Sequence, residues 1–145
     1  MEKAISLLAD LPDINVKNAD GACLLHTAIA YKNHAVIKPL LEAGIDVNAV
    51  DADGLTPLHY AAVYQNASVA EEILSRGGDL GIIDRYGNTA LWRAVFHARG
   101  KYEVVEVFLR HGGGKFATTK NLHGTSPLDM ATQFGEKQLI EMLQS

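Results

Sequence analysis

Four glycine residues recur along this sequence at nearly constant spacing, and a similar run of residues follows each of them. Gly21, Gly54, Gly87 and Gly124 are separated by 33, 33 and 37 residues. The run is most complete at 56–62, where the sequence reads Thr-Pro-Leu-His-Tyr-Ala-Ala. A repeat of this length restricts the fold to a row of similar supersecondary units, because each unit must pack on the next one.

One of these units can be interpreted residue by residue. Thr56 is placed to cap the N-terminus of a helix, and Pro57 suits the first helical position because its missing N–H is not needed there. We expect a first helix at about 57–65 and a second helix at about 68–76. Gly77 then stands where a left-handed residue commonly ends a helix.

The second helix of this unit carries its apolar residues on one side. Val69, Ile73 and Leu74 are spaced so that they form a single apolar stripe. A pair of helices this short cannot bury such a stripe alone, so the pair must stack on its neighbours. We therefore expect four side chains to be buried: Leu58, Leu74, Leu91 and the single cysteine, Cys23.

The repeated residues resemble those of the ankyrin-repeat family. The family pattern reads Gly-x-Thr-Pro-Leu-His-x-Ala-Ala, then Val-x-x-Leu-Leu, then Gly-x-Asp-Val-Asn-Ala. It is nearly complete from Asp51 to Gly77, and 44–49 match its last part. The resemblance covers nearly all of the chain. It implies one all-α domain, 1–145, built as a solenoid of four turn-helix-helix repeats preceded by an N-terminal capping helix.

The same alignment gives the expected boundaries. A half repeat at 1–17 is followed by repeats at about 18–50, 51–83, 84–120 and 121–145.

The third repeat departs from the regular spacing. We expect two extra residues near 97–101 and two near 115–122. They would lengthen one helix-to-helix turn and one finger, which is the hairpin-like turn that precedes each first helix. In addition, Trp92 stands where the family pattern has histidine, and Cys23 stands where it has threonine.

Composition limits the classes of function. The chain has 145 residues, 48% apolar and 21% charged, and its net charge of −4 provides no basic field for nucleic acid. No apolar run approaches the roughly 20 residues that span a bilayer. The single cysteine excludes an intramolecular disulfide and a cysteine zinc site. We expect a cytoplasmic protein that binds neither nucleic acid nor membrane.

Charge is spread unevenly along the chain. Residues 1–84 contain 12 acidic and 5 basic side chains, a balance of −7, whereas residues 85–145 contain 5 acidic and 8 basic ones, a balance of +3. An acidic end of this kind would attract a basic partner.

Six histidines invite a catalytic or metal-binding interpretation. His26 and His59 occupy the same repeat position, where the family uses histidine to hydrogen-bond around the start of the helix. The other four are scattered over expected turns and helix ends, so we expect no metal site.

Two further patterns resemble catalytic or nucleotide-binding motifs without satisfying them. His123, Ser126 and Asp129 would come from one finger and one helix, whereas the members of a catalytic triad normally come from separate elements. The run 112–115 lacks both the first glycine and the hydroxyl residue of a phosphate-binding loop. We expect neither enzymatic activity nor a cofactor.

The resemblance also implies a binding surface. In this family, the fingertips and the exposed ends of the first helices line a concave groove that binds partners. The tenth residue after each glycine is Tyr31, Tyr64, His97 or Phe134, which is more aromatic than a composition of 7% aromatic residues predicts. Tyrosine is enriched at interface hot spots, which favours a partner-binding role. Stacking of the rings between repeats is the structural alternative.

The candidate partner-binding residues are Asp20, Tyr31, Asp53, Leu55, Tyr64, Arg85, Tyr86, Phe96, His97, His123 and Phe134. Among them, we expect Tyr31, Tyr64, Tyr86 and Phe134 to face solvent in the free protein.

These features favour a non-catalytic protein-binding module, monomeric when free, that acts as an inhibitor. The segment 84–96, with the Arg99-Gly100 insertion, resembles small free-standing bacterial ankyrin proteins, several of which are similar to immunity proteins that neutralise a toxin. The resemblance implies a basic toxin domain as the partner. An inhibitor or adaptor of a host or housekeeping protein, such as a kinase or transcription factor, is the alternative, and a purely structural spacer is a further one.

Overall fold

The computed structural model describes residues 13–145, and the α-helices of this part come in pairs. The helices are α2 (Leu24–Ala30), α3 (His34–Glu42), α4 (Pro57–Val63), α5 (Ala67–Ser75), α6 (Ala90–Phe96), α7 (Glu103–Arg110), α8 (Pro127–Phe134) and α9 (Lys137–Gln144), with a 3₁₀ helix, η1 (Gly113–Phe116), after α7. Within 13–145 the only β-type pairing is an isolated bridge between Lys17 and Cys23. The N-terminal capping helix that we predicted lies in residues 1–12, outside the described residues.

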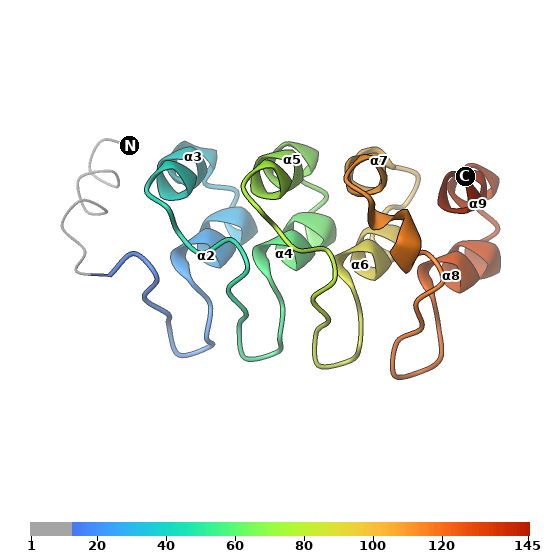
Figure 1. The fold of residues 1–145 in the computed structure, drawn as a ribbon, viewed down its shortest axis with the longest axis horizontal. Helices are drawn as coiled ribbons and strands as arrows, with labels where there is room; N and C mark the ends of the chain where they lie inside the picture. The colour runs from blue at the N-terminus through green and yellow to red at the C-terminus, as the bar shows by residue number, and fades with distance from the viewer. Residues whose placement is uncertain (1–12) are drawn as a thin grey trace.

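The helices form two layers with the fingers projecting below them (Figure 1). Helices α2, α4, α6 and α8 form one layer, and α3, α5, α7 and α9 form the other. Each helix of the first layer packs on its neighbours in that layer and on the helix that follows it in sequence. The all-α solenoid predicted from the repeat is confirmed.

The first helix of each pair begins as its sequence predicts. The hydroxyls of Thr56, Thr89 and Ser126 accept backbone N–H groups three residues later, at 3.3, 3.1 and 3.0 Å. Proline follows the cap in α4 and α8. In α2 the cap is Cys23, and its own N–H donates to Nδ1 of His26 (3.0 Å), so a side chain from inside the helix takes part in the cap.

The core runs along the whole stack between the two layers. Leu58 and Leu91 are fully buried, as predicted, and Cys23 is 1% exposed. Leu74 is only partly buried and corrects the prediction for this residue. It lines a surface hollow of about 440 Å³ between the Gly77–Gly81 connection and η1, so solvent reaches one side of it.

One of the two predicted insertions in the third repeat is confirmed, and the other lies in the connection before a finger and not in the finger itself. All four fingers close with the same hydrogen bond, from the N–H of the first residue to the carbonyl four residues later, so no finger is lengthened. The connection from α5 to the following finger has eight residues (76–83), whereas the connection from α7 to the following finger has ten (111–120). The second insertion is therefore in the connection that contains η1, where a short 3₁₀ turn absorbs the added chain. The predicted longer turn between α6 and α7 is present at 97–102.

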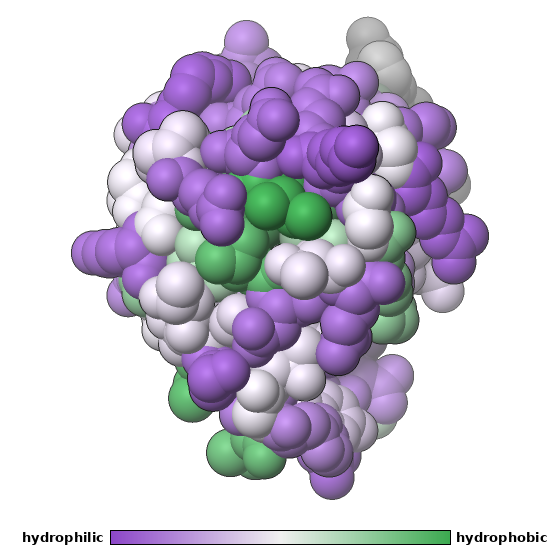
Figure 2. Space-filling model, turned by 90° about the vertical axis from the view of Figure 1, so that its right-hand side faces the viewer, coloured by the Kyte–Doolittle hydropathy of each residue, from purple (hydrophilic) through white to green (hydrophobic). Residues whose placement is uncertain are grey.

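The C-terminal end of the stack is largely hydrophilic. Seen from that end, a small hydrophobic area is surrounded by hydrophilic residues (Figure 2). Lys137, Gln138 and Glu141 of α9 are exposed, so the outer side of this helix is polar.

Candidate binding surface

Each finger is held closed by the side chain of its first residue. The carboxylate oxygen Oδ1 of Asp51 accepts the N–H groups of Asp53 and Leu55, both at 2.9 Å. The same pair of bonds closes the other fingers, where the accepting residues are Asn18, Asp84 and Asn121. These side chains satisfy backbone groups that a tight turn would leave without partners.

Backbone hydrogen bonds join each fingertip to the next one. The N–H groups of Ala52, Arg85 and Leu122 donate to the carbonyls of Asp20, Asp53 and Tyr86, at 2.9, 2.9 and 3.0 Å. Gly54 has a φ of +79° and permits this approach, because a Cβ there would lie 3.2 Å from the backbone nitrogen of Arg85. We call this row of bonds the fingertip ladder.

Two buried histidines, His26 and His59, each connect their own repeat to the following finger. Nδ1 of His59 accepts the N–H of Thr56 (3.1 Å), so Nε2 carries the proton and donates to the carbonyl of Asn88 (2.9 Å). His26 reaches the carbonyl of Leu55 at 2.8 Å in the same way. Burial lowers the pKa of both rings below the ordinary value, because charging them away from water is unfavourable. The structural role that the family resemblance implied for these histidines is confirmed.

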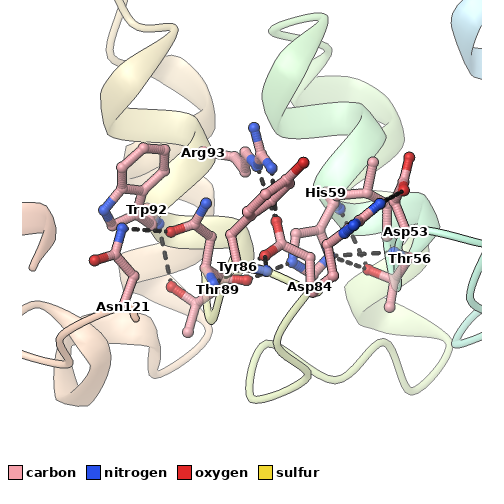
Figure 3. A network of polar contacts seen from close by, with 12 residues as sticks. Asp53, Thr56, His59, Asp84, Tyr86, Thr89, Trp92, Arg93 and Asn121 are labelled. Atoms are coloured by element: carbon pink, nitrogen blue, oxygen red, sulfur yellow. Dashed lines mark hydrogen bonds and ion pairs between the residues drawn. The ribbon is translucent and has the colours of Figure 1, made fainter. Parts of the chain in front are cut away.

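Acidic side chains at the base of two fingers are also bound within the protein. The carboxylate of Asp84 is fully buried and accepts from Nη2 and Nε of Arg93 at 2.7 and 3.1 Å (Figure 3). The hydroxyl of Tyr60 donates to Asp51 at 2.8 Å, and burial followed by this contact raises the pKa of the tyrosine. These two carboxylates therefore position the first helices and are not available to a partner.

The predicted aromatic residues lie at the surface. Tyr31 is 81% exposed, Tyr64 and Tyr86 are 44% exposed, and Phe134 is 49% exposed, which confirms the exposure predicted for these four. Phe96 is 45% exposed, whereas His97 is half-buried. These rings occupy the C-terminal parts of the first-layer helices and one finger.

Only some of the candidate residues contact one another. The rings of Phe96 and Phe134, from neighbouring repeats, lie 6.5 Å apart, and His97 meets Phe96 edge-on at 5.0 Å. Arg85 pairs with Asp53 at 3.0 Å in an exposed contact. The guanidinium of Arg85 also lies over the ring of Tyr86, 5.3 Å from its centroid. The remaining candidates are spread along the stack: Asp20, Tyr31, Tyr64 and His123 are exposed, and Leu55 is half-buried.

The comparison with protein families decides what kind of chain this is. A family model for three copies of the ankyrin repeat matches residues 2–84, and a model for a single ankyrin repeat matches residues 86–120. The chain belongs to the ankyrin-repeat family. Ankyrin repeats are typically non-catalytic interaction modules, so the family indicates a protein that binds other proteins. A comparison with curated proteins gives no significant match.

Beyond the family matches, the ankyrin pattern continues to the end of the chain. Helices α8 and α9 repeat the arrangement of the three pairs before them, and Ser126 and Pro127 reproduce the cap of α4. Within residues 13–145, no group of three or more His, Cys, Asp or Glu side chains is arranged to hold a metal ion. In the same part of the chain, no helix is long and apolar enough to cross a membrane.

Several exposed or partly exposed apolar side chains were not among the candidates. Leu122 is 76% exposed at the tip of the last ankyrin finger, and Ile83 is 54% exposed just before the third. Trp92 replaces the histidine that connects repeats, and its ring stacks on Phe96 with centroids 5.3 Å apart and planes 10° from parallel. The substitution was visible in the sequence, but its contact with Phe96 depends on the α6 geometry.

Proposed function

We propose that this chain is an inhibitor that acts by occupying a partner protein with its concave face. The row of exposed aromatic side chains at Tyr31, Tyr64, Phe96 and Phe134 carries this proposal, because each described repeat contributes one exposed ring at the tenth residue after its glycine or, for Phe96, at the ninth. Covering large rings that face water is favourable when a partner binds, and little conformational entropy is lost because these side chains have few rotatable bonds. The eleven candidate residues named above form the proposed surface.

The more specific form of the proposal is neutralisation of a toxin. It is supported by the resemblance of residues 84–96 to small bacterial ankyrin proteins and by the acidic balance of residues 1–84. Asp20 is exposed at the first fingertip and makes no ion pair within residues 13–145, so its charge is available to steer a basic toxin. We propose further that the protein is cytoplasmic and monomeric before it binds.

A regulatory inhibitor or adaptor of a host or housekeeping protein is the second candidate function. The same surface would serve it, so gene context separates the two. A toxin gene beside the gene for this chain favours the immunity role, and a kinase or transcription factor as the captured partner favours the regulatory role.

The test begins with affinity purification from the source cells and continues with the partner that mass spectrometry identifies. Among Tyr31, Tyr64, Tyr86 and Phe134, alanine at one or two positions should weaken binding by about 2 kcal/mol or more, which is roughly 30-fold in Kd, without lowering thermal stability. Glu106→Ala, at an exposed position on α7 in the other layer, is the matched control and should bind like the parent.

If the partner is a toxin, cells that produce it should survive only when this chain is co-expressed. Unchanged affinity in the alanine variants of Tyr31, Tyr64, Tyr86 and Phe134 would rule out the concave face as the binding surface. Failure to rescue cells from any neighbouring toxin would remove the immunity role and leave the regulatory one.

A further inference from the structure

The two halves of the aromatic row differ in chemistry. In the first half, Tyr64 lies 6.3 Å from Tyr60, whose ring packs edge-on against His26 at 4.6 Å and whose hydroxyl is bound to Asp51. Tyr31 and Tyr64 also carry hydroxyls that water can satisfy while the rings stay exposed. Exposure of tyrosine therefore costs less than exposure of a ring without a polar group.

The second half presents rings that have no hydroxyl. Trp92, Phe96, His97 and Phe134 form one continuous group, which we call the terminal aromatic cluster. Trp92 stacks on Phe96 at 5.3 Å, His97 meets Phe96 at 5.0 Å, and Phe134 lies 6.5 Å from Phe96. Half-exposed phenylalanine rings that are already held by neighbours form a preorganised apolar surface.

The indole N–H of Trp92 makes no hydrogen bond in this cluster. Its Nε1 is buried and has no partner within the described residues, whereas His59 at the equivalent place connects two repeats. A buried N–H without a partner destabilises the folded protein. The indole ring compensates by supporting Phe96 from one side and by lying 5.7 Å beneath the guanidinium of Arg93.

The charge beside the cluster is positive. Arg93 is paired with Asp84, but Arg99 and Lys101, in the turn that follows His97, are exposed and make no ion pair within residues 13–145. The pKa of His97 lies below its ordinary value, first because of burial and then because Arg93 and Arg99 oppose a further positive charge. On the next repeat, the acidic residue nearest to Phe134 in sequence is Glu136. Its carboxylate already accepts a hydrogen bond from the hydroxyl of Tyr102 at 2.8 Å.

We infer that the terminal aromatic cluster anchors the partner, and that the partner presents an apolar side chain followed closely by a carboxylate. The apolar side chain covers Phe96 and Phe134, and the carboxylate pairs with Arg99. This inference rests on the proposed function only in taking the concave face as the binding surface. It differs from the acidic-end hypothesis, since it places the strongest contacts on the third and fourth repeats.

The anchor can be probed with peptides because the chain contains one tryptophan. A library of random 12-residue peptides displayed on phage is selected on the immobilised full chain, and the selected peptides are synthesised. Each is titrated against the protein while Trp92 emission is followed. Peptides seated on Phe96 should change this emission, and they should combine a leucine, isoleucine or aromatic residue with a nearby Asp or Glu.

Matched variants separate the anchor from the rest of the row. The pair Phe96→Ser with Phe134→Ser should weaken peptide binding by at least tenfold, and Tyr31→Ser with Tyr64→Ser should change it less than threefold. Arg99→Glu should also weaken binding by about tenfold. Lys32→Glu is its control, because Lys32 is exposed in the corresponding turn after α2 and has the same left-handed backbone, with φ of 55° against 47° for Arg99. Circular dichroism confirms that each variant is folded.

Several results would overturn the inference. The inference is wrong if the selected peptides are rich in lysine or arginine, if they leave Trp92 emission unchanged, or if they bind the Phe96 and Phe134 variant normally. It is also wrong if the selection yields no peptide whose binding depends on the cluster. If binding is lost only in the Tyr31 and Tyr64 variant, the concave face remains the proposed surface and the anchor assignment is wrong. If neither pair affects any peptide, both proposals fail.

Discussion

Replacing His59 with leucine tests whether the polar contacts between repeats hold the stack together. The substitution keeps a buried apolar side chain but removes both ring nitrogens. The N–H of Thr56 loses its acceptor at 3.1 Å, and the carbonyl of Asn88 loses one of its two donors, at 2.9 Å, but keeps the N–H of Asp84 at 3.0 Å. The buried N–H left without a partner costs about 1–3 kcal/mol and the lost second bond to the carbonyl about 0.5–1.5 kcal/mol, so we expect a loss of about 2–4 kcal/mol in the free energy of unfolding. A domain of this size has about 5–15 kcal/mol in total.

The loss should also depend on pH. Burial lowers the pKa of His59 in the folded protein, so the unfolded chain takes up a proton first as the pH falls below about 6.5. The parent protein therefore keeps the full contribution of His59 above this pH and loses it progressively below. The variant has no proton to take up at this position, so the gap in stability between parent and variant should narrow between pH 7.5 and 5.5.

Urea denaturation at several pH values, followed by circular dichroism, measures both effects. His34→Leu is the control, because His34 is exposed at the start of α3, and it should change stability by less than about 0.5 kcal/mol. A loss below 1 kcal/mol for His59→Leu, or a gap that does not narrow at low pH, would refute the reasoning.

Three other substitutions test the core and the fingers. Leu91→Ala should cost about 2–5 kcal/mol in thermal denaturation, and Leu74→Ala should cost clearly less because the hollow beside it already admits solvent; equal losses would contradict this account of Leu74. Native Cys23 should react with a thiol reagent far more slowly than a free thiol, and labelling at the free rate would show that it is not buried. Asp51→Lys should destabilise the protein by several kcal/mol, because it removes two hydrogen bonds to backbone N–H groups and one to the hydroxyl of Tyr60. Asp20→Lys should leave the melting temperature unchanged and, if the partner is basic, slow association in low salt. Equal melting temperatures of the two variants would contradict the role of Asp51.

Much of the fold could be predicted from the sequence because the residues that begin and end the helices act locally within each repeat. The cap at Thr56 and Pro57 and the left-handed Gly77 depend on neighbouring residues alone, and both are present in the structure. The position of the second insertion could not be predicted in this way. Both a finger and a connection tolerate extra residues, and only the packing of η1 after α7 separates them.

The binding surface was less accessible to sequence reasoning. Exposure of the aromatic row follows from its repeat position, but the contact of Trp92 with Phe96 depends on side-chain rotamers. The roles of the acidic finger residues could not be predicted from the sequence either. Asp51 lies two residues from Asp53 in a turn, yet Asp51 holds the finger closed whereas Asp53 forms an exposed pair with Arg85. An acidic balance counted along the chain therefore overstates the charge that a partner would meet.

The fingertip ladder separates the residues that specify folding from those that can specify a partner. Its bonds join main-chain groups, so the spacing of the fingers does not depend on which side chains stand at Ala52, Arg85 or Leu122. Substitutions at these tips can accumulate while the turn-closing residues and the buried histidines are retained. The same scaffold can thus evolve toward a new target through a few surface changes, each nearly neutral for stability.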